Sequence, residues 1–200
     1  MAGNELSFSI KGDKETVKAL NKLGSNLPAA LESTMQQIMF FLQATIQREK
    51  LSGSPLKVRT GRLRSSITNL VQRVGNVIIG IVGTNVRYGA IHEFGGVIRP
   101  KSSKYLAIPL DAAKTPSGVA RGGPRSFQNT FVRKTQAGNL IIFGKPNPGA
   151  KEAEPLFILK KFVRIPARPY MRPALEENAE NIRQLFRNTL VRMAEQLRVT

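Results

Sequence analysis

Hydrophobic and polar residues alternate at the start of the chain and then change to a helical spacing. Leu6, Phe8 and Ile10 alternate with polar residues, which predicts a short strand over Glu5–Ile10. From Asp13 to Gly24 the apolar residues recur at intervals of three. This predicts a helix that Asp13 caps and Gly24 ends.

A second and longer helical pattern begins at Pro28, a residue suited to the first turn of a helix. Apolar residues recur at spacings of three and four as far as Ile46, and the pattern ends between Lys50 and Gly53. A helix of this length would span roughly 35 Å, enough to lie across a sheet. We interpret its apolar residues as core: Leu31, Met35, Ile38, Met39, Leu42 and Ile46.

Strand patterns dominate the middle of the chain. After a polar loop, Gly61–Ile67 fits either a turn of helix or the entry to a strand. Gly75–Asn76 separates two apolar runs, Thr68–Val74 and Val77–Val82, and this arrangement predicts a β-hairpin. The next stretch, Arg87–Gly96, has glycines on both sides of its aromatic pair and is predicted as a glycine-hinged turn at the sheet edge, with Tyr88, Ile91 and Phe94 turned back into the core.

The second half of the chain contains an irregular segment and then regular patterns again. Asp111–Gln128 is rich in Gly and Pro and has no periodicity, so we predict a long loop or arm that is mobile in the free subunit. The remaining patterns predict short strands at Val97–Arg99 and Leu106–Leu110, a hairpin of Thr130–Thr135 with Leu140–Phe143, one strand over Leu156–Ile165, and a final helix from Pro173.

This order of elements predicts an α+β fold. We expect an antiparallel β-sheet packed by a long N-terminal helix and a C-terminal helix. The chain is expected to form a single domain over residues 1–200, with an inserted loop and β-hairpin arm at about 100–155.

The net charge is the most informative property of the composition. The chain has 31 Lys and Arg against 13 Asp and Glu, a net charge of +18. Between Lys57 and Lys145 the only acids are Glu93 and Asp111, so the middle of the chain carries the positive surface. Such a surface attracts nucleic acid, acidic proteins and anionic membranes alike.

Composition removes several classes of function. The chain has no cysteine, which excludes disulfides and thiolate metal sites and fits a reducing compartment. No apolar run approaches the length of a membrane span, and no secretory leader is recognised, so we expect no membrane association. Sparse aromatic residues in the basic arm disfavour sequence-specific recognition of single strands.

Catalytic patterns are weak. Gly138–Lys145 differs from a phosphate-binding loop in its spacing, and Pro146 stands where a Ser or Thr would bind magnesium. His92, the only histidine, stands beside Glu93, but no second His or any Cys could complete a metal site. We therefore expect no enzyme, no metal and no cofactor, and we interpret His92 as a structural or interface residue.

Three blocks of sequence occur in a characteristic order. Thr60–Ile67 begins Thr-Gly-Arg-Leu-Arg, Tyr88–Gly95 reads Tyr-Gly-Ala-Ile-His-Glu-Phe-Gly, and Pro166–Leu175 contains two Arg-Pro pairs. Together they resemble the tail-completion and neck proteins of long-tailed bacteriophages, and are similar to lambda minor tail protein Z and the Mu virion-morphogenesis protein. The segment between the second and third blocks is much longer than in simpler members.

The resemblance implies a structural virion protein, assembled in the host cytoplasm and located in the tail or neck. It implies a ring, expected to be a hexamer, that joins the tail to the head beside head-closure or adaptor, tail-terminator or tube proteins. Contact with packaged DNA is a further expectation. The residues that we expect at interfaces are Arg62, Arg64, Arg87, Tyr88, His92, Glu93, Phe94, Arg121, Arg125, Arg133, Lys134, Arg168 and Arg172.

Two alternatives remain open at the level of sequence. The charge alone fits a basic nucleic-acid-binding protein. A tail-terminator or tail-tube subunit would share the virion location but occupy another position. Deletion of Asp111–Glu154 is expected to leave a folded subunit that does not join tails to heads.

Overall fold

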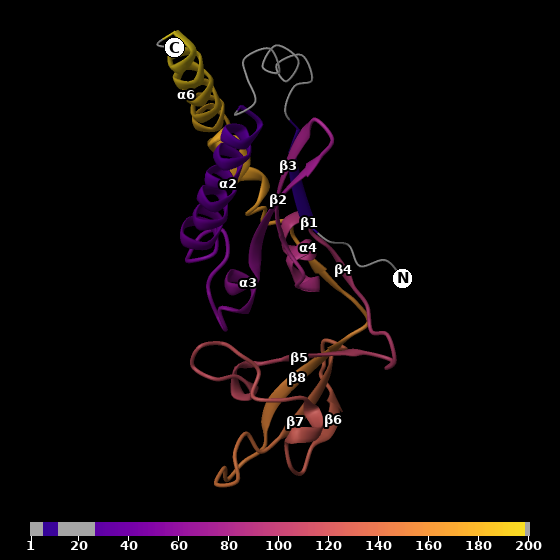
Figure 1. The fold of residues 1–200 in the computed structure, drawn as a ribbon. Coiled ribbons are helices and arrows are strands. Elements are labelled where there is room, and N and C mark those ends of the chain that lie inside the picture. Colours follow the sequence, from indigo (N-terminus) through magenta and orange to yellow (C-terminus); the bar gives the residue numbers. More distant parts are fainter. Residues whose placement is uncertain (1–5, 12–26, 199–200) are drawn as a thin grey trace. The chain divides into compact units, whose positions relative to one another are not determined.

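The computed structural model describes residues 6–11 and 27–198 of the chain, which divides into two compact units (Figure 1). Unit 1 consists of residues 1–94 and 167–200, and unit 2 consists of residues 95–166. The predicted helix over Asp13–Gly24 lies outside the described residues. Helices and antiparallel sheets occur together, so the predicted α+β class is confirmed.

Unit 1 contains a three-stranded antiparallel sheet in the order β1-β3-β2. Its strands are β1 (Leu6–Lys11), β2 (Ile67–Val74) and β3 (Val77–Thr84). The predicted hairpin is confirmed, and Gly75 adopts the positive φ of +60° that its tight turn requires.

The long helix predicted from Pro28 is confirmed as α2 (Leu27–Thr45), which continues as a π-helical turn, η1 (Ile46–Lys50). It lies against one face of the sheet because its apolar residues recur at helical spacing (Figure 1). At Gly80 a Cβ atom would lie 2.6 Å from the Met39 sulfur and 2.7 Å from the Met35 sulfur. The absence of a side chain there lets the helix approach β3 closely.

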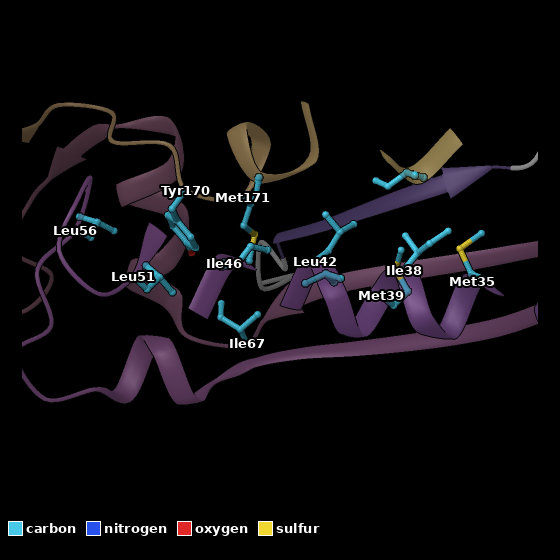
Figure 2. Packing of buried hydrophobic residues seen from close by; sticks show 13 residues of the cluster. Met35, Ile38, Met39, Leu42, Ile46, Leu51, Leu56, Ile67, Tyr170 and Met171 are labelled. Atoms are coloured by element: carbon cyan, nitrogen blue, oxygen red, sulfur yellow. The ribbon is translucent and has the colours of Figure 1, made fainter. Parts of the chain in front are cut away.

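The core of unit 1 joins residues from both ends of the chain (Figure 2). Met35, Ile38 and Leu42 of α2 are buried in one cluster with Tyr170 and Met171, which follow unit 2 in sequence. Unit 1 is therefore discontinuous in sequence. Part of its core, namely Tyr170, Met171, Ala174 and Ile182, follows residues 95–166.

The C-terminal helical pattern is divided into two helices, α5 (Arg172–Glu177) and α6 (Ala179–Arg198). The prediction of one continuous helix is wrong at Asn178, whose side-chain amide donates to the Ala174 carbonyl at 2.8 Å. Asparagine competes with helical backbone bonding in this way. Between α2 and α6 the hydroxyl groups of Thr34 and Thr189 form a buried hydrogen bond of 2.8 Å.

Two short helices lie beside the sheet of unit 1. The first is α3 (Arg62–Ser65), which Gly61 introduces with a φ of +72°. The second is α4 (Arg87–Phe94), so the prediction of a glycine-hinged turn at this stretch is wrong. Gly95, with a φ of +71°, follows the helix and ends it, as expected of a glycine after a last helical turn.

Unit 2 contains two antiparallel sheets. The first is a short ladder of β4 (Gly96–Ile98) with β9 (Val163–Ile165), in which Gly96 pairs with Ile165. The second has the order β5-β8-β7-β6, with the bounds β5 (Leu106–Pro109), β6 (Phe131–Lys134), β7 (Leu140–Gly144) and β8 (Glu154–Lys160).

The single strand predicted over Leu156–Ile165 is wrong, because β8 and β9 belong to different sheets and Lys161–Phe162 separates them. Apolar residues resume at Phe162 directly after Lys160 and Lys161, and two lysines do not by themselves indicate a change of partner strand. The predicted strands at 97–99 and 106–110 and the hairpin at 130–143 are confirmed within one or two residues.

The Gly- and Pro-rich segment forms the loop that was predicted, with two 3-10 turns, η2 (Asp111–Ala113) and η3 (Pro124–Ser126). It packs onto one face of the four-stranded sheet. Ala113 is fully buried there with Ile142, Leu156 and Phe157, and Phe127 meets Phe157 edge-on at 5.5 Å.

Candidate functional site

The carboxylate of Glu93 is a closely organised polar group among the described residues of unit 1. It lies on α4, is 3% exposed, and accepts three backbone N–H groups from the start of α5. Oε2 accepts from Tyr170 at 2.7 Å and from Met171 at 2.9 Å, and Oε1 accepts from Arg172 at 3.0 Å. A capping side chain accepts the unpaired N–H groups at the start of its own helix. The Glu93 carboxylate does the same for α5 from a distant position in the sequence.

His92 reinforces the same connection through its backbone. Its carbonyl accepts the N–H of Arg168 at 2.6 Å. The imidazole stands edge-on to the Tyr88 ring, with ring centroids 6.1 Å apart. Burial, and then the nearby Arg168 guanidinium, lower the pKa of His92, so the neutral form is favoured.

Tyr170 fills the space beside Gly89 on α4. A Cβ at Gly89 would lie 2.8 Å from the Tyr170 hydroxyl, which explains a glycine inside a helix. Burial, followed by the charge of Glu93 and the proximity of Tyr88, raises the pKa of Tyr170 well above its usual range. In the described part of the chain neither this hydroxyl nor Nδ1 of His92 makes a hydrogen bond.

Among the described residues, Glu93 and His92 form no catalytic pair. Glu93 is held by backbone amides and His92 points its ring toward Tyr88, so the two side chains form no acid–base pair. Among the described residues no group of three His, Cys, Asp or Glu side chains could hold a metal ion.

Exposed aromatic and basic residues surround this buried connection. Tyr88 is 41% exposed and Phe94 is 58% exposed, so the expectation that they turn back into the core is wrong. The side chains of Arg87, Arg168 and Arg172 are also exposed. We call these five residues the α4 surface. Aromatic residues and arginine are the types enriched at protein interfaces.

The remaining candidate residues lie in two places. Arg62 and Arg64 are exposed on α3, whose Leu63 lies against Gly89 and so beside α4. Arg121, Arg125, Arg133 and Lys134 belong to unit 2 and are exposed. Within unit 2, Arg121 has a structural task, because its guanidinium donates to the carbonyls of Lys114 and Pro146.

Sequence reasoning grouped Glu93 with the candidate interface residues and missed its structural role, and it missed Tyr170 altogether. One signal could have identified Glu93, since it is one of only two acids between Lys57 and Lys145. A lone carboxylate in so basic a segment needs a specific partner. No comparable signal identified the three backbone amides at 170–172, because backbone donors are not visible in a sequence.

Comparisons with known proteins bear on unit 1. Residues 14–95 match the model of the HK97-gp10-like family, described as "Bacteriophage HK97-gp10, putative tail-component". The matched region reaches from before α2 to the end of α4 and supports a phage tail or neck component, located in the virion. Neither the comparison with curated proteins nor that with solved structures gives a match.

The helices in the described part of the chain are too short or too polar to cross a membrane.

Proposed function

We propose that the chain is a ring-forming neck or tail-completion subunit that joins the tail of a long-tailed phage to its head. The observation that carries this proposal is the match of residues 14–95 to a phage tail-component family. The Pro166–Leu175 block lies outside that match, and its resemblance to lambda minor tail protein Z and the Mu virion-morphogenesis protein adds support. The proposed partners are further copies, as a hexamer, and the adjacent adaptor, terminator or tube proteins.

The α4 surface is the proposed contact between neighbouring subunits. Its rings of Tyr88 and Phe94 are exposed beside three arginines, and exposed rings of this kind gain stability when another protein covers them. Because Glu93 fixes α4 to the start of α5, this surface is rigid before assembly.

Unit 2 is the proposed link to a neighbouring subunit or ring. Strand β6 is at the edge of its sheet, and all four of its residues are exposed. An exposed edge strand can pair with a strand from another chain.

Deletion of unit 2 tests this proposal. Removing Asp111–Glu154 would take β6 and β7 out of a four-stranded sheet and leave only the β5–β8 pair. A cleaner deletion replaces residues 97–164 with a two-residue turn, because Gly96 and Ile165 are already paired. We expect this variant to keep the thermal stability of unit 1 and to leave heads and tails unjoined in infected cells.

Normal yields of complete particles from the shortened chain would contradict the role of unit 2. Loss of folding in the shortened chain would assign residues 95–166 to the core of unit 1 instead. Ring formation is measured separately, by the mass of the purified assembly. Phe94→Ser is expected to reduce it, whereas Val58→Ser, an exposed apolar residue in a loop, serves as the matched control.

A second candidate function is contact with nucleic acid, which the charge of unit 2 favours. Unit 2 has thirteen cations against three acids, Asp111, Glu152 and Glu154; the cations are Arg99, Lys101, Lys104, Lys114, Arg121, Arg125, Arg133, Lys134, Lys145, Lys151, Lys160, Lys161 and Arg164. Duplex binding with a steep salt dependence near physiological salt would support it. A shallow dependence and weak binding would leave the cations to protein partners.

The position along the particle is a separate question. A tail-terminator or tube subunit would carry the same family resemblance. Imaging particles with this subunit labelled would place the label at the head–tail junction under the present proposal, and along or below the tube under the alternative.

A further inference from the structure

The four-stranded sheet of unit 2 has two different faces. The loop of residues 110–128 packs on one of them, where the buried cluster of Ala113, Ile142, Leu156 and Phe157 lies. Side chains alternate between faces along each strand, so Ile141 and Ile158 point the other way. Leu156 remains on the first face because β8 has an irregularity of register beside it. None of the side chains on that second face belongs to the hydrophobic clusters of the described residues.

The strand register aligns a row of isoleucines across this second face. Ile108 pairs with Ile158, Ile158 pairs with Ile141, and Ile141 pairs with Arg133 at the edge strand. Phe143 pairs with Phe131 on one side of the row, and Lys160 pairs with Leu106 on the other. We call these eight residues the isoleucine face.

The isoleucine face is apolar, partly exposed and basic at its border. The three isoleucines are half-buried, and Phe131 is 51% exposed while its ring stacks on Phe143 at 5.8 Å. Lys160 donates to the Asn139 side chain at 2.8 Å and keeps further N–H donors. No residue of the face is acidic.

Unit 1 shows how this chain covers an apolar sheet face, since α2 places an apolar stripe over β2 and β3. An amphipathic helix would cover the isoleucine face in the same way. Net charge distinguishes a helix of a second copy of this chain from a helix of a different protein. A second copy at +18 would bring more cations to Arg133 and Lys160, and like charges at a contact oppose binding. Nucleic acid would pair with the cations but leave the isoleucines uncovered.

We propose that the isoleucine face binds an acidic amphipathic helix of a different protein, with the apolar stripe of that helix over Ile108, Ile158 and Ile141. Its carboxylates would pair with Arg133 and Lys160. The inference rests on the proposed function in one respect, namely that the chain works among other virion proteins. Binding to purified protein and particle assembly in cells are separate measurements, so each idea can fail alone.

The experiment uses the full chain and three synthetic peptides of equal length. The first has a leucine stripe at helical spacing and glutamate elsewhere. The second has the same composition in scrambled order, and the third has lysine in place of glutamate. We expect the striped acidic peptide to bind at least about tenfold more tightly than the scrambled one near physiological salt, and the lysine peptide to bind weakest.

Variants locate the binding site. The double substitution I141T/I158T keeps β-branched side chains and is expected to weaken the striped acidic peptide about tenfold. Arg133→Glu on the exposed edge should weaken it as well, and it does not depend on tolerance of core changes. The matched control is L70T/V74T, which makes the same kind of change at exposed apolar residues of β2 in unit 1.

Three results would overturn the proposal. Equal affinity for striped and scrambled acidic peptides would mean that charge alone is recognised. An equal loss of affinity for the striped acidic peptide in L70T/V74T and in I141T/I158T would show that the peptide does not bind at the isoleucine face. A self-association of the free chain that both I141T/I158T and Arg133→Glu abolish would make a second copy the occupant.

Discussion

The Glu93 carboxylate accepts the backbone N–H of Tyr170 at 2.7 Å although 77 positions separate the two residues in sequence. Two more amides, of Met171 and Arg172, complete the set. The backbone at the start of α5 is therefore held by a side chain that precedes unit 2 in sequence, whereas α5 itself follows unit 2.

Glu93→Gln should destabilise unit 1. The amide nitrogen of glutamine donates and cannot accept, so at least one buried backbone N–H would lose its partner. We expect the free energy of unfolding to fall by about 1–3 kcal/mol in urea denaturation. The exposed Glu176→Gln is the control, and equal stability of the two variants would show that the amides find other acceptors.

His92 should make stability depend on pH. Its pKa is lowered from 6.5 by burial and by Arg168, so the unfolded chain binds more protons than the folded chain in the window below 6.5. Stability then rises with pH through that window and falls as the pH drops below 6.5. Urea unfolding at about pH 7.5 and about pH 5.5 measures the difference.

The change of stability between these two pH values can be assigned to His92 because the chain has one histidine. His92→Gln should reduce the difference between the two pH values, and the same difference in both proteins would remove His92 as its source. Arg168→Gln should raise the pKa of His92 toward 6.5 in an NMR titration.

Gly80→Ala should disturb the contact of α2 with β3. The new methyl group would meet the sulfur atoms of Met39 and Met35, both of which are 1% exposed and have little room to move. We expect a loss of about 1–3 kcal/mol of unfolding free energy. Gly123→Ala, where a Cβ has open space, should change stability little, and similar losses at both glycines would point to a general backbone effect.

The hydroxyl groups of Thr34 and Thr189 should be coupled. Each hydroxyl oxygen also lies within hydrogen-bond distance of a carbonyl in its own helix, that of Ala30 or Leu185, so one threonine donates to its helix while the other donates across to it. Thr189→Val should cost about 1 kcal/mol, while T34V/T189V should cost less than the sum of the single changes, because no hydroxyl is left without its partner. Strict additivity in a double-mutant cycle would refute a direct contact.

Local patterns predicted the elements well where neighbours in sequence determine them. The apolar runs on either side of Gly75–Asn76 were sufficient for β2 and β3, and helical spacing was sufficient for α2. Arg87–Phe94 failed because Gly89 signalled a turn, whereas its real task is to leave space for Tyr170. That task depends on a residue that no local pattern relates to Gly89.

The division of strands among separate sheets was also not predicted from the sequence. Leu156–Ile165 is apolar except for Lys160, Lys161 and Arg164, and these cations do not reveal that β8 pairs with β5 and β7 while β9 pairs with β4. The candidate interface residues were chosen by type and by resemblance. The structure separates Glu93, which is buried and holds α5, from Tyr88 and Phe94, which are exposed.

In the ladder of β4 with β9, Gly96 pairs with Ile165, so the first and last strands of unit 2 are neighbours. For the fold of unit 1, unit 2 therefore acts as a loop whose two ends are already held together. The entropy cost of closing a loop grows slowly with its length, by about 0.6 kcal/mol for each doubling. Insertions and deletions within residues 99–162 should therefore be nearly neutral for the fold of unit 1. Under the proposed function, evolution could remodel residues 99–162 to suit changing partners while residues 14–95, which match the phage tail-component model, stay fixed.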